Sequence, residues 1–103
     1  MSIVPYKKRI ITDASTTTVL SESCVVFEIV IAIAAIGTTW TLQIQDKASS
    51  PCILVPKFTA ALPTDFKPII MNFNEPVTMD GGIDIITTGT HGEACIWLIV
   101  GKN

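Results

Sequence analysis

The side chains that could carry out chemistry are few in this sequence, and they form no catalytic pattern. The only histidine, His91, lies between Thr90 and Gly92. A Ser-His-Asp triad would need this histidine, and no Gly-x-Ser-x-Gly elbow accompanies it. We interpret His91 as a polar residue of a hairpin loop. The alternative is a metal site made from three copies of His91 at the centre of a three-subunit assembly.

The carboxylates are scattered, and most fall in turn-like segments, where Asp bonds the local backbone. A glycosidase needs two of them at a fixed separation in a cleft, and a domain this small rarely has a deep cleft. The glycines at 81–82 and 89–92 read as turn glycines, because no helix signal follows them as in a phosphate-binding loop. We therefore predict no catalytic residue and no cofactor, and we expect that the chain is not an enzyme.

The three cysteines are isolated from one another. Cys24, Cys52 and Cys95 form no Cys-x-x-Cys pair, and an odd count does not suit a secreted disulfide framework. Each lies in an apolar neighbourhood, so we expect reduced, mostly buried thiols. A zinc site built from them and His91 would lack the usual local ligand spacing, and we predict no metal site.

The charge pattern argues against nucleic acid and membrane as partners. The net charge is −2 and the isoelectric point is about 5.1, whereas nucleic-acid binders are normally basic. The basic run Lys7-Lys8-Arg9, beside Tyr6, reads as a solvated flank. The most apolar run, residues 24–36, contains Glu28 and is shorter than the ~20 residues of a membrane-spanning helix. With no signal-peptide pattern visible, we expect synthesis and assembly in a reducing cytoplasm.

The distribution of Ile, Val and Thr predicts an all-β chain, because these residues favour pleated structure. Turn signals at short, regular intervals suggest a sandwich or barrel. We predict a two-sheet antiparallel sandwich with jelly-roll or Greek-key-like connections. Residues 1–11 would form an N-terminal arm or a first strand, and residues 12–103 a single domain. The chain would have eight or nine short strands: 8–12, 16–20, 24–34, 38–45, 52–59, 66–73, 77–79, 83–88 and 94–100, with a turn at 74–76 and a possible helical turn in 30–36.

Two of the predicted strands are apolar on both faces. In 24–34, simple alternation puts Val25, Phe27, Ile29, Ile31 and Ile33 on one face and Val26, Val30, Ala32 and Ala34 on the other. In 94–100, Ile96, Leu98 and Val100 alternate with Cys95, Trp97 and Ile99. A solvated antiparallel strand should show one polar face, so loops or another subunit must cover the second one.

The tryptophans divide between core and surface in this pattern. Trp40 shares a face with Leu42 and Ile44 and is expected in the core, whereas Trp97 suits the core or an interface equally. Only 16% of the residues are charged, against roughly 25% in an average soluble domain. We predict a subunit contact at Trp97 and Ile99, with Val26 and Val30 as alternatives, and contacts of an arm at Tyr6, Lys7, Lys8 and Arg9.

Two segments carry a resemblance to a known group of proteins. The segment "STTTVLSESCVVFEIVIAIAAIGTTWTLQIQD" joins a Ser/Thr-rich opening to a long apolar strand, and "MDGGIDIITTGTHGEACIWLIVG" closes with a Gly-bearing turn and an apolar strand. With "LPTDFKPIIMNFNEPV" between them, the pattern resembles small β-sandwich proteins of tailed-bacteriophage virions over about residues 12–100.

The resemblance implies a structural role in a virion, most specifically that of a capsid decoration (cement) subunit, although it transfers no individual functional residue. The partners would be further copies of the chain, as a homo-oligomer and expected trimer, and the major capsid protein or other virion proteins. A tail, head-fibre or connector component remains an alternative. So does a carbohydrate-binding module, whose aromatic platform would have to come from Tyr6, Trp97 or a phenylalanine.

Overall fold

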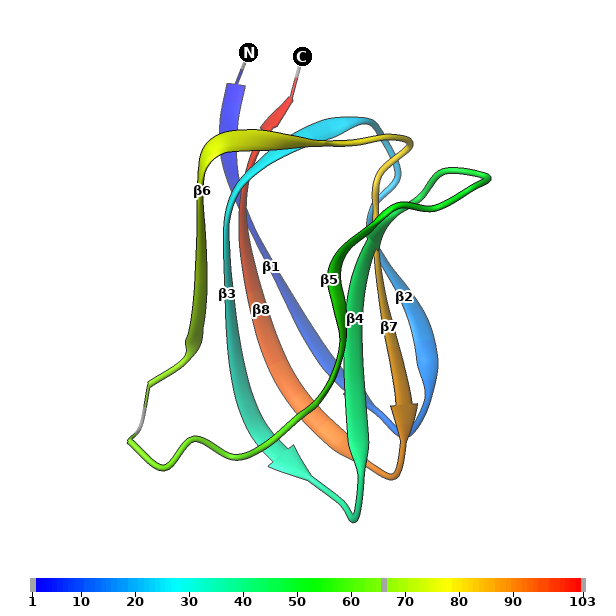
Figure 1. Ribbon diagram of the computed structural model, residues 1–103, viewed down its shortest axis with the longest axis vertical. Helices are drawn as coiled ribbons and strands as arrows, with labels where there is room; N and C mark the ends of the chain where they lie inside the picture. The colour runs from blue at the N-terminus through cyan, green and yellow to red at the C-terminus, as the bar shows by residue number, and fades with distance from the viewer. Residues whose placement is uncertain (1, 66, 103) are drawn as a thin grey trace.

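The computed structural model describes residues 2–65 and 67–102, which form eight strands in two four-stranded antiparallel sheets packed as a sandwich (Figure 1). One sheet has the order β1-β8-β3-β6 and the other β2-β7-β4-β5. The predicted all-β sandwich is therefore confirmed. The strand bounds are β1 Ser2–Thr12, β2 Ser15–Leu20, β3 Cys24–Ile36, β4 Trp40–Asp46, β5 Ile53–Thr59, β6 Ile69–Met79, β7 Ile83–Gly89 and β8 Gly92–Lys102.

The order of the strands is that of a jelly roll. Along the chain, β1, β3, β6 and β8 enter one sheet while β2, β4, β5 and β7 enter the other. Two interlocked Greek keys give this arrangement in double-sheet jelly rolls. Because β8 and β3 are the inner strands of their sheet, the two segments that are apolar on both faces lie side by side at its centre.

The N-terminal segment is a full strand and not a flexible arm. Strand β1 pairs with β8 from Ser2 opposite Lys102 to Thr12 opposite Gly92, and the two chain ends lie side by side in Figure 1. The strand 8–12 expected from the sequence is thus too short at its start, because Pro5 is tolerated at the sheet edge.

A β-bulge in β3 overturns the predicted position of Val26. The register against β8 shifts between Val26 and Glu28, which leaves Phe27 as an extra residue. Cys24 and Val26 therefore point into the core together with Ile29 and the inward residues that follow it. Val26 is completely buried and cannot be a surface contact. The segment 30–36 is extended strand, with no helical turn.

Strand β6 also differs from the prediction. The expected turn at 74–76 and separate strand 77–79 are part of one strand that runs from Ile69 to Met79. The signal at 74–76 marks an irregularity, because β3 pairs with Asn72 on one side of it and Val77 on the other. The predicted start at Phe66 lies outside the described residues.

The core is filled from both sheets around Trp40, which is completely buried, as predicted. Its indole lies against Gly92 at the start of β8. A Cβ atom at position 92 would stand 1.9 Å from Cδ2 of the ring, so only glycine leaves room for the indole there. The buried apolar side chains include Ile29, Ile31, Leu42, Ile44, Ile83, Ile85, Ile96, Leu98 and Val100.

Polar side chains fasten the turns at the end of the sandwich where both termini lie. The carboxylate of Asp46, which is almost completely buried, accepts hydrogen bonds from the backbone N–H groups of Cys52 (2.8 Å) and Asp80 (3.4 Å). Nearby, Ser23 Oγ accepts a hydrogen bond from the Gly81 N–H at 2.9 Å. These contacts join the β2–β3, β4–β5 and β6–β7 connections.

Lys102, near the C-terminus, is held by two partners. Its ammonium donates a hydrogen bond to the Tyr6 hydroxyl at 2.8 Å and forms an ion pair with Glu22. The hydrogen bonds to Glu22 and Tyr6 raise the pKa of Lys102 above its ordinary value. The last strand is thereby tied to β1 and to the β2–β3 turn.

Three of the four edge strands contain a proline. The sheet edges are β1, β6, β2 and β5, and Pro5, Pro76 and Pro56 lie in the first, second and fourth of these. Proline has no N–H to donate to a neighbouring strand. Strand β2 is the edge without one.

We expect Gly92→Ala to destabilise the fold by about 1–3 kcal/mol or more, because the added methyl group overlaps the Trp40 indole. Urea unfolding followed by circular dichroism measures the loss. In the double variant Gly92→Ala/Trp40→Leu, the smaller Leu side chain should relieve the overlap. The loss of unfolding free energy in the double variant should therefore be smaller than the sum of the losses in the two single variants. Strictly additive losses would contradict this packing.

The Lys102 cluster should give a stability that depends on alkaline pH. Because folding raises the Lys102 pKa, its contribution is complete below the unfolded-state pKa of about 10.4 and is lost as the pH rises above it. We expect the melting temperature of the wild type to fall more steeply above that pH than that of Lys102→Met. Parallel curves for the two proteins would count against the cluster.

Candidate functional site: the outer face of the β1-β8-β3-β6 sheet

The outer face of the β1-β8-β3-β6 sheet carries apolar side chains in rows that cross the strands. Because residues paired across antiparallel strands share a face, the register defines these rows. The central row comprises Lys7, Trp97, Val30 and Ile70. On one side of it lie Pro5, Ile99, Glu28 and Asn72, and on the other Arg9, Cys95 and Ala32.

Several of these side chains are open to solvent. Trp97 is 39% exposed and Ile70 is 60% exposed, while Val30, Ala32 and Ile99 are half-buried. The predicted contact residues Trp97, Ile99 and Val30 thus lie together on one face. A monomer rarely exposes a contiguous apolar patch larger than a few hundred Å², so this face is the candidate interaction site.

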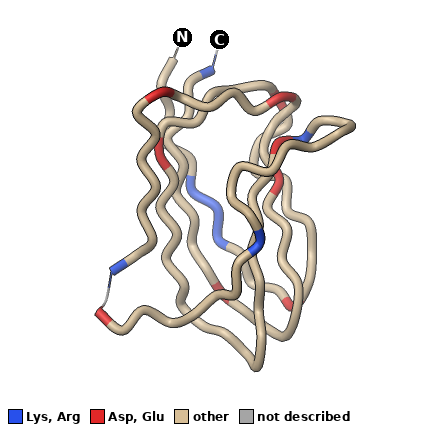
Figure 2. The backbone as a smooth tube through the Cα atoms, viewed as in Figure 1, with Lys and Arg blue, Asp and Glu red and all other residues tan. Residues whose placement is uncertain are grey.

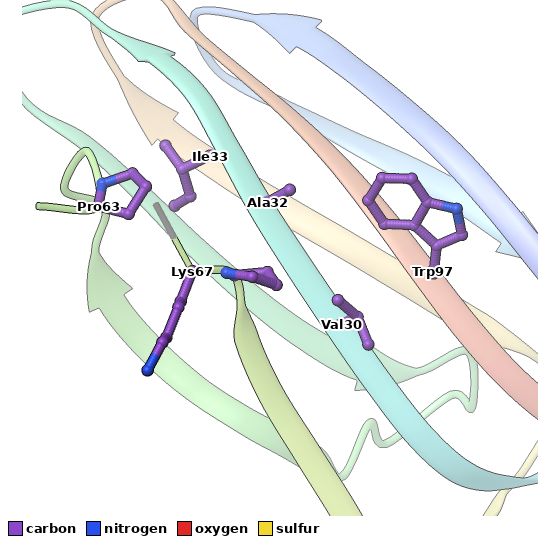
Figure 3. Close-up of a pocket in the computed structure, with 7 residues that line it drawn as sticks. Val30, Ala32, Ile33, Pro63, Lys67 and Trp97 are labelled. Atoms are coloured by element: carbon purple, nitrogen blue, oxygen red, sulfur yellow. The ribbon is translucent and has the colours of Figure 1, made fainter. Parts of the chain in front are cut away.

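A groove of about 530 Å³ opens beside Trp97 on this face (Figure 3). Its floor is Val30 and Ala32 of β3, and Trp97 and Pro63 stand on opposite sides of them. Among the described residues, its lining is Val30, Ala32, Ile33, Pro63, Lys67, Pro68 and Trp97. The only charged side chain among them is that of Lys67, so the groove suits an apolar occupant.

Two smaller hollows extend the groove, and both include Ile33. One, of about 400 Å³, lies at the open side of the sandwich between Leu62 of the β5–β6 connection and Ile69 of β6. The other, of about 320 Å³, lies beside Arg9 and Cys95.

The outer face of the opposite sheet is polar by contrast. Thr41 and Thr88 are joined by their hydroxyl groups, and Gln43 donates to Gln45 at 2.9 Å. On the edge strand β2, Thr18 donates to Asp84 at 2.7 Å. These polar side chains satisfy one another and suit a solvated face. Ile86 of β7 lies among them, opposite Gln43, but polar residues predominate here, so the two outer faces of the sandwich differ in character.

Basic residues flank the apolar rows. Lys7 and Arg9 lie on the outer face of β1, directly opposite Trp97 and Cys95 of β8, and Figure 2 shows the continuous basic run on this strand. Tyr6 and Lys8 alternate to the other side, where Tyr6 packs against the core. The four residues predicted as arm contacts therefore divide between two faces, and only Lys7 and Arg9 lie beside Trp97.

His91 lies in the exposed β7–β8 hairpin between two carboxylates. Its Nε2 is 3.3 Å from Glu93 Oε1, and its Nδ1 is 4.0 Å from Asp13 Oδ1. All three side chains are at least partly open to solvent. In residues 2–65 and 67–102, no group of three or more potential ligands is placed to hold a metal ion.

The cysteines do not share one environment, so the prediction of three buried thiols is wrong in part. Cys24 is buried, but Cys95 lies half-buried on the outer face and Cys52 is exposed. Cys52 immediately precedes β5, in the loop fastened by Asp46, and an apolar sequence neighbourhood did not distinguish this loop from a strand. All three thiols are free.

Several residues of the site could not be identified from the sequence. Pro63, Lys67 and Pro68 belong to the β5–β6 connection, which reaches the groove because the chain crosses from one sheet to the other there (Figure 1). Ile70 joins the central row through the pairing of β6 with β3. Both facts depend on the sheet topology. Alternation within a single strand was the signal that identified Trp97 and Ile99.

No protein-family model matches the sequence, and no curated protein or solved structure gives a significant match. The part of the chain that the structure describes contains no helix long and apolar enough to cross a membrane.

The thiols should differ in their rates of reaction with Ellman's reagent. We expect Cys52 to react fastest and Cys24 slowest, because burial, and then the charge of Glu22, raises the pKa of the Cys24 thiol and thiolate is the reactive form. Cys52→Ser should remove the fast phase, and denaturant should make the remaining thiols equivalent. A fast phase that persists in Cys52→Ser would contradict the assigned exposure.

Proposed function

We propose that the chain is a structural subunit of a virion, most specifically a capsid decoration subunit, attached through the outer face of the β1-β8-β3-β6 sheet. The observation that carries the proposal is the difference between the two outer faces. Trp97, Val30 and Ile70 form an apolar row on one, while the other carries mainly Thr and Gln side chains that bond one another, with Ile86 among them.

The mechanism is adhesive. Contact with a neighbouring subunit removes apolar area from water, and each Å² contributes about 25 cal/mol before the costs of association. Repeated symmetric contacts on a particle then combine through multivalency. The expected partners are copies of the chain, as a homo-oligomer that we expect to be a trimer, and the major capsid protein or another virion protein.

The topology supports the proposal at the level of fold. Double-sheet jelly rolls occur in viral capsid domains, but also in lectins and cupins, and a fold alone does not define a function. The resemblance to small virion sandwiches and the apolar outer face point in the same direction. A head-fibre, connector or tail position would use the same adhesive face.

Carbohydrate binding is the second candidate, and the half-exposed Trp97 is the observation that favours it. An aromatic ring beside a groove can stack on a sugar. However, sugar hydroxyls require hydrogen-bonding partners, and among the described groove residues only the Lys67 ammonium and the Trp97 indole N–H are side-chain donors, with no side-chain acceptor. The lining therefore fits apolar side chains of a protein better than a saccharide.

Charged substitutions on the outer face should abolish association while the domain stays folded. We expect Trp97→Glu/Ile99→Glu to sediment as a monomer, or to lose its attachment to particles prepared without the chain, because the partner would have to bury two unpaired charges. Analytical ultracentrifugation at micromolar concentration and co-sedimentation with particles measure the two effects.

The matched control is Gln43→Glu on the polar outer face, which should behave as the wild type. Circular dichroism of each variant establishes that it is folded. A wild type that is monomeric and binds no particle would contradict the proposed function, and so would a folded Trp97→Glu/Ile99→Glu variant that keeps every contact.

A further inference from the structure

The groove beside Trp97 is bordered by positive charge on two sides. Lys7 and Arg9 border it on β1, and Lys67 belongs to its lining on the β5–β6 side. All three side chains are exposed. Among the described residues the ion pairs within 4.0 Å are those of His91 and Lys102, so these three cations have no carboxylate partner there.

Three carboxylates lie on or beside the same face, but none of them lines the groove. Asp65 lines the neighbouring hollow together with Lys67, and its Oδ1 accepts a hydrogen bond from the Lys67 backbone N–H at 3.2 Å. Glu28 lies in the row of Ile99, one row away from Trp97. Glu93 lies beyond Arg9 and is 3.3 Å from His91. The face as a whole is therefore balanced, but the charged side chain that lines the groove itself is a cation, Lys67, and Lys7 and Arg9 lie beside Trp97. Positive charge thus borders the groove in a chain whose net charge is −2.

Resting on the proposed function, we propose that the occupant of the groove is an extended segment of a different chain, in which apolar residues are interspersed with Asp and Glu. Its apolar side chains fill the space between Trp97 and Pro63, and its carboxylates pair with Lys7, Arg9 and Lys67. The positive charge at the border of the groove favours Asp and Glu in the bound segment, and the apolar floor favours apolar side chains between them.

A second copy of the chain, which is an expected partner for the face as a whole, is a poorer occupant of the groove itself. Face-to-face packing of two such faces would bring two sets of unpaired cations together, and like charges across an interface are unfavourable. The groove is also concave and bordered by a connection, which suits a narrow segment better than a flat sheet.

A series of three peptides tests the proposal. Each is a capped decapeptide in which Leu, Val and Pro alternate with a variable residue, which is Asp or Glu in the first, Ser or Gln in the second and Lys in the third. Trp97 is the exposed tryptophan and Trp40 is buried, so a blue shift of the fluorescence reports binding at the groove. We expect affinity in the order acidic, neutral, basic, with the acidic peptide weakened by added salt.

Charge-neutralising variants of the chain locate the contact. Lys7→Gln/Arg9→Gln and Lys67→Gln should each weaken the acidic peptide about threefold to fivefold, as expected for exposed ion pairs, and should leave the neutral peptide unchanged. Lys47→Gln, in the β4–β5 loop on the far side of the molecule, is the matched control and should bind like the wild type. Trp97→Leu should weaken all three peptides and abolish the fluorescence change.

Equal affinity for the three peptides, or no effect of the Lys7, Arg9 and Lys67 variants, would overturn the proposal. Self-association of the wild type through Trp97 that the acidic peptide does not disrupt would also overturn it, since a second copy would then occupy the groove. Binding to vesicles with 30% phosphatidylglycerol, but not to the acidic peptide, would assign an anionic lipid surface instead.

These outcomes are separate from failure of the proposed function. If Trp97→Glu/Ile99→Glu loses particle binding while the peptides show no charge preference, the adhesive face stands and only the acidic occupant is wrong. If the wild type neither associates nor binds particles, the proposed function fails whatever the peptides show.

Discussion

The extra residue at Phe27 fixes which side chains of β3 face the core and which face outwards. An unbroken alternation that buried Val26 would also bury the carboxylate of Glu28, which carries a large desolvation cost without a partner. The bulge resolves this conflict, because it lets Val26 and Ile29 both point inwards and leaves Glu28 outside. From there the register sets Ile31 and Ile33 in the core and Val30 and Ala32 on the outer face. Bulges commonly re-aim side chains in this way.

The same register gives the sheet its two different surfaces. Strand β8 runs beside β3 with Ile96, Leu98 and Val100 in the core, so Trp97 and Ile99 must point outwards opposite Val30 and Glu28. The outward apolar side chains of β8 and β3 thus meet at the centre of one sheet. In the other sheet, most of the corresponding outward positions are polar, and Ile86 is the apolar exception on the inner strands. The asymmetry between the faces follows from residue type at alternate positions, once the register is set.

The sequence was a good guide wherever a residue's environment depends on its own strand. The strand class, the burial of Trp40 and the outward side of Trp97 and Ile99 all follow from local alternation and turn signals. Prediction failed where a residue's environment depends on a segment that is distant in the sequence. The bulge at Phe27 is visible only against β8, the continuity of β6 through Pro76 depends on its pairing with β3, and Cys52 lies exposed because the buried Asp46 fixes its loop. Pro63 and Lys67 reach the groove only through the crossover between sheets, which no local pattern specifies.

The prolines of the edge strands bear on how many subunits can gather in one place. A sandwich with long unpaired edges can add strands from neighbours without limit and form fibres. Pro5, Pro56 and Pro76 interrupt the donors on three of the four edges, and the remaining edge, β2, is only six residues long. Open-ended polymerisation by strand addition is therefore hindered at three of the four sheet edges. Contacts between subunits at high concentration are then favoured through the faces of the sheets. A chain with such edges can reach a high concentration with little tendency to grow into fibres by adding strands.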